Sequence, residues 1–117
     1  MDKELKLTAE TVDGGMFVLA VDGEIDIYTA PDLERELLPG VENGATGVLI
    51  DLTDCRFIDS TALGVLLRAR RRLNGARGIA LVAADPHVRK VFEVTGLDRI
   101  FAIHPTRAAA LAEASGD

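Results

Sequence analysis

Hydrophobic and polar residues alternate at the beginning of the chain. Leu5, Leu7 and Ala9 are separated by polar residues, and this period of two predicts a strand with one buried face. The Asp-Gly-Gly sequence at 13–15 is a turn signal, because glycine tolerates positive φ. Residues 16–21 have the pattern of a returning strand, so the chain is expected to begin with a β-hairpin.

The next segment changes to the spacing of a helix. Leu33, Leu37 and Val41 recur at i, i+4 and i+8, which places them on one apolar face. This helix is expected to begin at Thr29, whose hydroxyl can cap exposed amides. The Asn-Gly pair at 43–44 is expected to end it.

Three more helices are predicted further along the chain. One covers residues 59–73 and is rich in leucine. Another begins at Asp85, where an Asp-Pro pair suits a helix start, and ends at Gly96. A short alanine-rich helix capped by Thr106 is expected near the end.

Short apolar runs lie between these helices. Residues 48–52 and 79–83 have the pattern of strands buried on both faces, and residues 100–103 are expected to form the last strand. The order β-β-α-β-α-β-α-β-α implies parallel strands joined by right-handed crossovers, with antiparallel pairing from the hairpin. We therefore expect an α/β fold: a mixed, mostly parallel sheet of about five strands packed against about four helices.

Composition narrows the class of protein. The length of 117 residues suits one domain, here expected over residues 1–117 with its core at about 4–114. The net charge of -6 argues against binding to nucleic acid or to an anionic membrane. No apolar run approaches membrane-spanning length, and the start lacks the apolar core of a signal peptide. With one cysteine and two histidines, a disulfide and a zinc site are not expected. We expect a cytoplasmic monomer.

The candidate chemistry lies at the start of the leucine-rich helix. Asp59 is placed to cap the helix, which puts Ser60 and Thr61 in the first turn. A phosphate on Ser60 would lie beside backbone amides at the positive end of the helix dipole. On these residues alone, simple capping is the favoured role and phosphorylation the alternative. Ser60 is a weak candidate for a hydrolytic nucleophile, because nothing marks His87 or His104 as its base and there is no G-x-S-x-G motif.

Three segments in this order and spacing resemble the STAS family, named for sulfate transporters and anti-sigma factor antagonists. Residues 21–30 (VDGEIDIYTA) are similar to the G-E-[IL]-D segment before the family's first helix. Residues 48–52 followed by 57–66 (FIDSTALGVL) resemble its strand, loop and phospho-acceptor motif D-S-[ST]-G-L-G-x-L. Residues 91–97 (VFEVTGL) resemble its helix ending in a T-G-L-type turn.

The resemblance implies a partner-switching protein rather than an enzyme. In small free-standing antagonists, the serine after the aspartate is phosphorylated by an anti-sigma factor that is also a serine kinase; that position is Ser60 here. The unphosphorylated protein would bind the kinase and free a sigma factor, and a phosphatase would reset the phosphorylated form. ATP would belong to the kinase, so we expect no cofactor in this chain. The implied partner surface comprises Asp26, Tyr28, Thr29, Asp59, Ser60, Thr61, Leu63 and Gly64.

Three features bear on partner choice or have more than one possible role. Ala62 stands where many members have glycine, and we expect it to alter how closely a kinase approaches. The arginine-rich run at 68–72 suits a solvated helix end, with a partner or nucleic-acid patch as the alternative. Cys55 is expected to be a small buried or loop residue.

Two alternative functions stand beside the leading one. The first is a STAS subunit of a stress-signalling or lipid-transport assembly. The second is a small-molecule or nucleotide-binding domain, for which the chain lacks a glycine-rich phosphate loop. The intact Asp-Ser-Thr sequence at 59–61 favours the antagonist over both.

Overall fold

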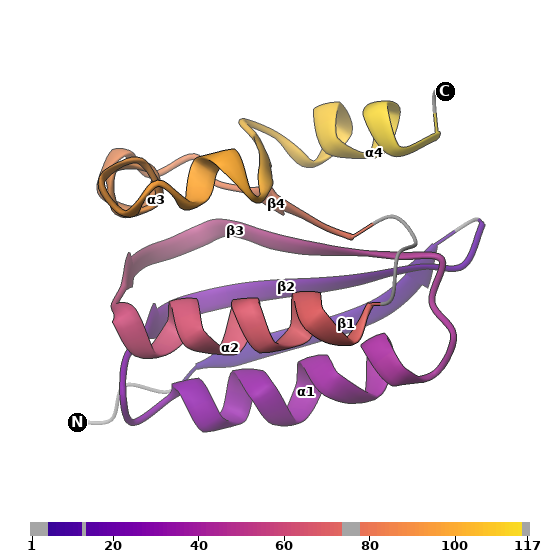
Figure 1. The fold of residues 1–117 in the computed structure, drawn as a ribbon, viewed down its shortest axis with the longest axis horizontal. Helices are drawn as coiled ribbons and strands as arrows, with labels where there is room; N and C mark the ends of the chain where they lie inside the picture. The colour runs from indigo at the N-terminus through magenta and orange to yellow at the C-terminus, as the bar shows by residue number, and fades with distance from the viewer. Residues whose placement is uncertain (1–4, 13, 74–77, 116–117) are drawn as a thin grey trace.

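The elements follow one another in the predicted order (Figure 1). The computed structural model describes residues 5–12, 14–73 and 78–115. Its elements are β1 (Lys6–Val12), β2 (Met16–Ile25), α1 (Ala30–Glu42), β3 (Gly47–Ile58), α2 (Ser60–Arg72), β4 (Ile79–Val82), α3 (Pro86–Thr95), the 3₁₀ turn η1 (Leu97–Arg99), β5 (Ala102–His104) and α4 (Arg107–Ser115). In the described part of the chain, no helix is both long and apolar enough to cross a membrane. Asp13 of the predicted turn and the two ends of the expected domain, 1–4 and 116–117, lie outside the described residues.

The strands form a five-stranded sheet in the order β1-β2-β3-β4-β5. The β1–β2 hairpin is antiparallel, whereas β3, β4 and β5 each join the sheet in parallel. The expected α/β fold with a mixed, mostly parallel sheet is therefore confirmed. Some boundaries differ: β2 and β3 extend beyond residues 21 and 52, and η1 takes up part of the chain expected to lead into the last strand.

Helices cover the two faces of the sheet unequally. Alternate strand residues such as Leu19, Ile50 and Leu81 pack into the main core with α1, α2 and α3. Residues of opposite parity, such as Val18 and Leu49, form a smaller cluster with α4. Figure 1 shows α1 and α2 side by side along the β1–β2–β3 part of the sheet.

Salt bridges join α1 to α2 along their exposed sides. Arg68 makes a bidentate contact with Glu34, through Nε to Oε2 (2.9 Å) and Nη2 to Oε1 (3.0 Å). Hydrogen bonding to Arg68 lowers the pKa of Glu34. Arg72, one helical turn after Arg68 on α2, pairs with Glu42 of α1. Two cations of the arginine-rich run therefore bind the neighbouring helix, which supports a structural role for that run.

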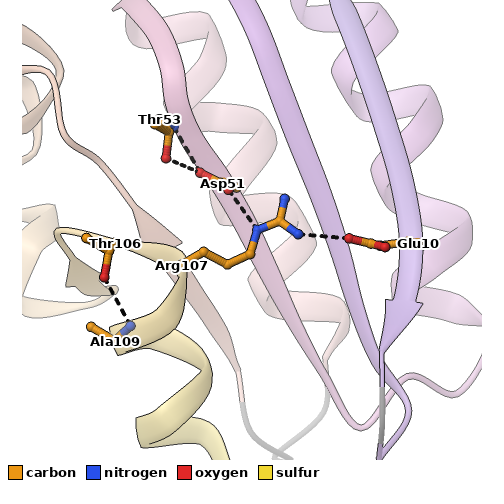
Figure 2. Close-up of polar contacts among 6 residues, drawn as sticks. All are labelled: Glu10, Asp51, Thr53, Thr106, Arg107 and Ala109. Atoms are coloured by element: carbon orange, nitrogen blue, oxygen red, sulfur yellow. Dashed lines mark hydrogen bonds and ion pairs between the residues drawn. The ribbon is translucent and has the colours of Figure 1, made fainter.

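A buried carboxylate on the other face ties α4 to the sheet (Figure 2). Asp51 of β3 is 8% exposed and accepts a hydrogen bond from Arg107 Nε at 2.9 Å. Arg107 also reaches Glu10 on β1 through Nη1 at 2.8 Å. Burial alone would raise the pKa of Asp51, but hydrogen bonds from Thr53 and Arg107 outweigh it, so its pKa lies below the usual value. This network was not predicted, because Asp51 stands inside an apolar run.

Candidate functional site

The register of two parallel strands brings the candidate acids to one edge of the sheet. Ile25, the last residue of β2, lies opposite Ile58, the last residue of β3. Asp26 and Asp59 follow directly, and the amide of Asp59 donates to the carbonyl of Ile25 at 3.2 Å. Segments that are 33 positions apart in the sequence therefore begin their loops side by side.

Asp26 builds the loop between β2 and α1. Its Oδ1 accepts hydrogen bonds from the amides of Tyr28 (2.9 Å) and Thr29 (3.0 Å). Its carbonyl accepts from the amides of Thr29 and Ala30. The side chain therefore closes a tight turn, which is an ordinary structural role for an acid at this position.

Thr29 does not cap α1, so the predicted role of its hydroxyl is wrong. The side chain is 7% exposed, and its hydroxyl donates to the carbonyl of Glu24 at 2.8 Å. The same oxygen accepts from the amide of Asp26 at 2.9 Å. The backbone of Thr29 lies in the α region, and no side-chain cap bond is formed there. The hydroxyl is turned back into the loop and fixes its shape.

Asp59 caps α2 as predicted and leaves Ser60 on the surface. Its Oδ1 accepts from the amides of Thr61 (2.9 Å) and Ala62 (3.3 Å). Ser60 is the first helical residue and is exposed, whereas Thr61 is half-buried. The preferred acceptor hydroxyl is thus the more accessible of the two.

The helix that follows presents one narrow surface beside Ser60. Gly64, one turn after Ser60, lies on the same half-exposed side of α2. Leu63 is only 7% exposed and packs in the main core, so it supports the expected partner surface from below and exposes little area to a partner. The Ala62 methyl is also fully buried, at 0% exposed, so it does not face a kinase as expected. Ala62 can therefore affect partner binding only indirectly, by changing how α2 packs on the core.

Exposed apolar side chains flank the same edge. Among the described residues, five large hydrophobic side chains are exposed, and Ile27 (63%), Tyr28 (85%) and Phe57 (47%) are three of them. Phe57 lies opposite Glu24 at the end of the β2–β3 pair. Tyr28 was expected on this surface from the sequence, whereas Ile27 and Phe57 were missed. The signal for Phe57 was its place next to the buried Ile58, since successive strand residues point to opposite faces.

Acidic groups accompany this apolar surface. Glu24 is the next-to-last residue of β2, and Asp26 and Asp59 directly follow β2 and β3. Cys55 of β3 lies opposite Gly23 of β2 and is fully buried, at 0% exposed. Burial raises the pKa of its thiol to about 11, and the carboxylates of Asp85 and Glu24 act in the same direction. The thiol is therefore protonated at neutral pH, and the edge presents carboxylates, hydroxyls and apolar groups.

Comparisons with known proteins identify the family and the fold. The model of the STAS domain matches residues 7–110. BtrV of Bordetella bronchiseptica, a putative anti-sigma factor antagonist by name, is 36% identical over 109 residues, which are 92% of this chain and 93% of BtrV. The crystal structure of an anti-sigma factor antagonist from Mycobacterium paratuberculosis has a TM-score of 0.89 at 34% identity, covering 94% of this chain and 93% of that one. The anti-sigma factor antagonist SpoIIAA in its unphosphorylated form has a TM-score of 0.80 at 25% identity, with 96% and 98% covered.

Proposed function

This chain belongs to the STAS domain family, and from that premise we propose that it is an anti-sigma factor antagonist switched by phosphorylation of Ser60. The unphosphorylated protein binds an anti-sigma factor at the carboxyl edge of β2 and β3. A sigma factor is then released for transcription. Phosphorylation of Ser60 by the anti-sigma factor, acting as a serine kinase, ends the complex, and a phosphatase restores the antagonist.

The observation that carries the proposal is the position of Ser60 within a surface suited to a protein partner. Ser60 is exposed directly after Asp59, at the strand edge where the Asp26 loop also begins, and Tyr28 and Phe57 provide exposed large apolar groups at the same edge. Exposed aromatic residues at the centre of a surface are typical anchors of protein interfaces. The neighbouring carboxylates suit a basic partner and steer its approach.

The local hydrogen bonds determine what a phosphate on Ser60 would meet. Asp59 already occupies the amides of Thr61 and Ala62, so the start of α2 has few donors left for a new anion. Phosphate adds about -1.5 to -2 charges next to Asp59, at the same strand edge as Asp26. The extra charge would therefore stay largely uncompensated at the surface.

An uncompensated dianion is enough to break the complex. A thousandfold weaker affinity corresponds to about 4 kcal/mol. Burying an unpaired charge in a dry interface costs several kcal/mol. The switch then works by blocking the surface, with little change in the backbone of the domain.

The transfer step needs only the serine hydroxyl from this chain. Ser60 Oγ forms a bond to the γ-phosphorus of ATP held by the kinase, while the bond to the leaving ADP breaks and the hydroxyl proton passes to a base. Incubating the protein with a candidate anti-sigma kinase and ATP, followed by intact-mass measurement, tests this step. We expect the mass of one phosphate on wild type and on Thr61→Ala, and none on Ser60→Ala. A phosphate retained on Ser60→Ala would contradict the assignment.

A further inference from the structure

The outer edge of β1 is a long and regular strand edge. β1 is the terminal strand of the sheet and pairs with β2 on one side. All seven residues, Lys6–Val12, stay in register with β2 without a bulge. An edge strand of this kind presents a row of backbone donors and acceptors that a further strand can pair with.

We propose that two copies of this chain pair through β1, antiparallel about a twofold axis at Thr8. Lys6 of each copy then lies opposite Glu10 of the second copy, and Leu7 lies opposite Ala9. Lys6, Thr8 and Glu10 share one face of the strand, and Leu7 and Ala9 share the other. The pairing thus unites the two sheets with matching faces on the same side.

The charges of β1 select this register. Centring the pair on Thr8 forms two Lys6–Glu10 contacts, one on each side of the axis. A shift that moves Lys6 by two positions places it opposite Thr8 or Val12, and both charge pairs are lost. Opposite charges directly across two strands are favourable, whereas like charges are not.

The helix-side face is also self-complementary. Leu5 and Leu7 are half-buried against the main core. Their positions opposite in the proposed pair are Thr11 and Ala9, which are smaller. Ala9 and Thr11 line a groove of about 410 Å³ together with Phe17, Pro39, Gly40 and Asn43. The leucines of the second copy would enter this groove.

The contact of Glu10 with Arg107 is compatible with the pairing. Arg107 binds Oε2 of Glu10, and a carboxylate has a second oxygen that accepts further donors. The Glu10 side chain is 51% exposed, so its free side can meet a lysine. Figure 2 shows Arg107 reaching from α4 across the sheet to Glu10, which holds this carboxylate on the strand face where the proposed pair needs it.

The proposed dimer leaves the Ser60 surface open. The twofold axis reverses the strand direction, so the carboxyl edges of the two copies point to opposite ends of the joined sheet. Each copy could therefore bind its own partner. A dimer departs from the monomer expected from the sequence, because that expectation did not use the position of β1 at the edge.

Charge reversal tests the pairing in solution. Sedimentation velocity over a concentration series should show reversible dimers of wild type. Lys6→Glu alone and Glu10→Lys alone should each weaken the dimer by about tenfold or more, because both contacts become repulsive. An equal mixture of these two variants should form heterodimers, because both contacts become attractive again. A monomer at all concentrations, or a dimer that neither variant weakens, would overturn the proposal.

Cross-linking tests the register and does not depend on the folding of the Glu10 variant. In Thr8→Cys the two introduced thiols face each other across the axis at a Cα separation of about 5 Å, within reach of a disulfide. In the control Lys6→Cys they lie about 13 Å apart, beyond that reach. Mild oxidation of each folded variant should link Thr8→Cys and leave Lys6→Cys unlinked. Equal linking of the two variants, or no linking of either, would contradict the proposed register. If this edge of β1 bound an unrelated peptide strand and not a second copy of the chain, the edge would belong to a different partner.

Discussion

The backbone of Asp59 is tied to that of Ile25 by a hydrogen bond of 3.2 Å between the Asp59 amide and the Ile25 carbonyl. This bond continues the parallel register of β2 and β3 past their last residues. It places the cap of α2 next to the loop that begins at Asp26. The candidate phosphorylation site is therefore built on two strand ends rather than on one flexible loop.

Asp59 has two roles that two substitutions separate. Asp59→Ala removes the cap of α2 and should lower the free energy of unfolding by about 1 kcal/mol. Asp59→Asn can still cap the helix but lacks the charge, so the stability should stay near that of wild type. Urea denaturation gives the stability, and titration with the anti-sigma factor gives the affinity. We expect Asp59→Asn to weaken binding, and an unchanged affinity would remove Asp59 from the charged surface.

The exposed apolar residues should serve binding rather than folding. Tyr28→Ala and Phe57→Ala should each weaken the anti-sigma factor complex by about 1–3 kcal/mol, as expected for interface anchors. Their effect on stability should stay within about 0.5 kcal/mol, because both side chains are exposed. Val94→Ala is the matched control, since Val94 is 71% exposed on α3. A similar loss of binding in that control would contradict the location of the surface.

Two glycines in helices should respond oppositely to alanine. A Cβ at Gly40 would lie 2.4 Å from the ring of Phe17, so Gly40→Ala should destabilise the fold by about 1–3 kcal/mol. A Cβ at Gly64 would meet only Arg68 Nη1 at 3.5 Å. Gly64→Ala should raise the stability by about 0.5–1 kcal/mol, because alanine loses less backbone entropy in a helix. Thermal unfolding of both variants decides this, and equal effects would show that the Phe17 contact does not limit α1.

Asp51 should make stability depend on pH in the acidic range. Its pKa is lowered in the folded state, so its contribution is present above the unfolded value of about 4 and is lost as the pH falls through the folded value. Asp51→Asn should cost about 1–3 kcal/mol at pH 7, and this difference should shrink below about pH 4. Glu10→Gln is the control, with an expected cost below about 1 kcal/mol because Glu10 is half-exposed. A cost for Asp51→Asn that stays constant to about pH 2 would exclude this linkage.

Local patterns in the sequence predicted much of this structure. Periodicity located the helices and strands of the fold, and the caps at Asp59 and Asp85 follow from residue type and position. The predicted capping role of the Thr29 hydroxyl was wrong. A threonine before a helix has the same sequence pattern whether or not a nearby acid such as Asp26 already binds the amides of the loop. That competition depends on the path of the loop, which no local pattern encodes.

Local sequence patterns did not predict the contacts between residues that are far apart in the chain. Asp51 and Arg107 are 56 positions apart, and neither carries a sequence signal for its partner. The exposure of Ile27 and Phe57 also escaped prediction, because large apolar residues in or directly after a strand are usually buried. The order of strands in the sheet, which leaves β1 at the edge, likewise follows from tertiary packing.

The most direct test of the switch compares the dissociation constant of the anti-sigma factor complex before and after phosphorylation of Ser60, at one ionic strength. A phosphate that blocks the partner surface directly should lower the affinity about a thousandfold, with amide chemical-shift changes confined to residues around 26–30 and 57–64. An equal affinity of the two forms, or shift changes spread across the sheet, would contradict this mechanism.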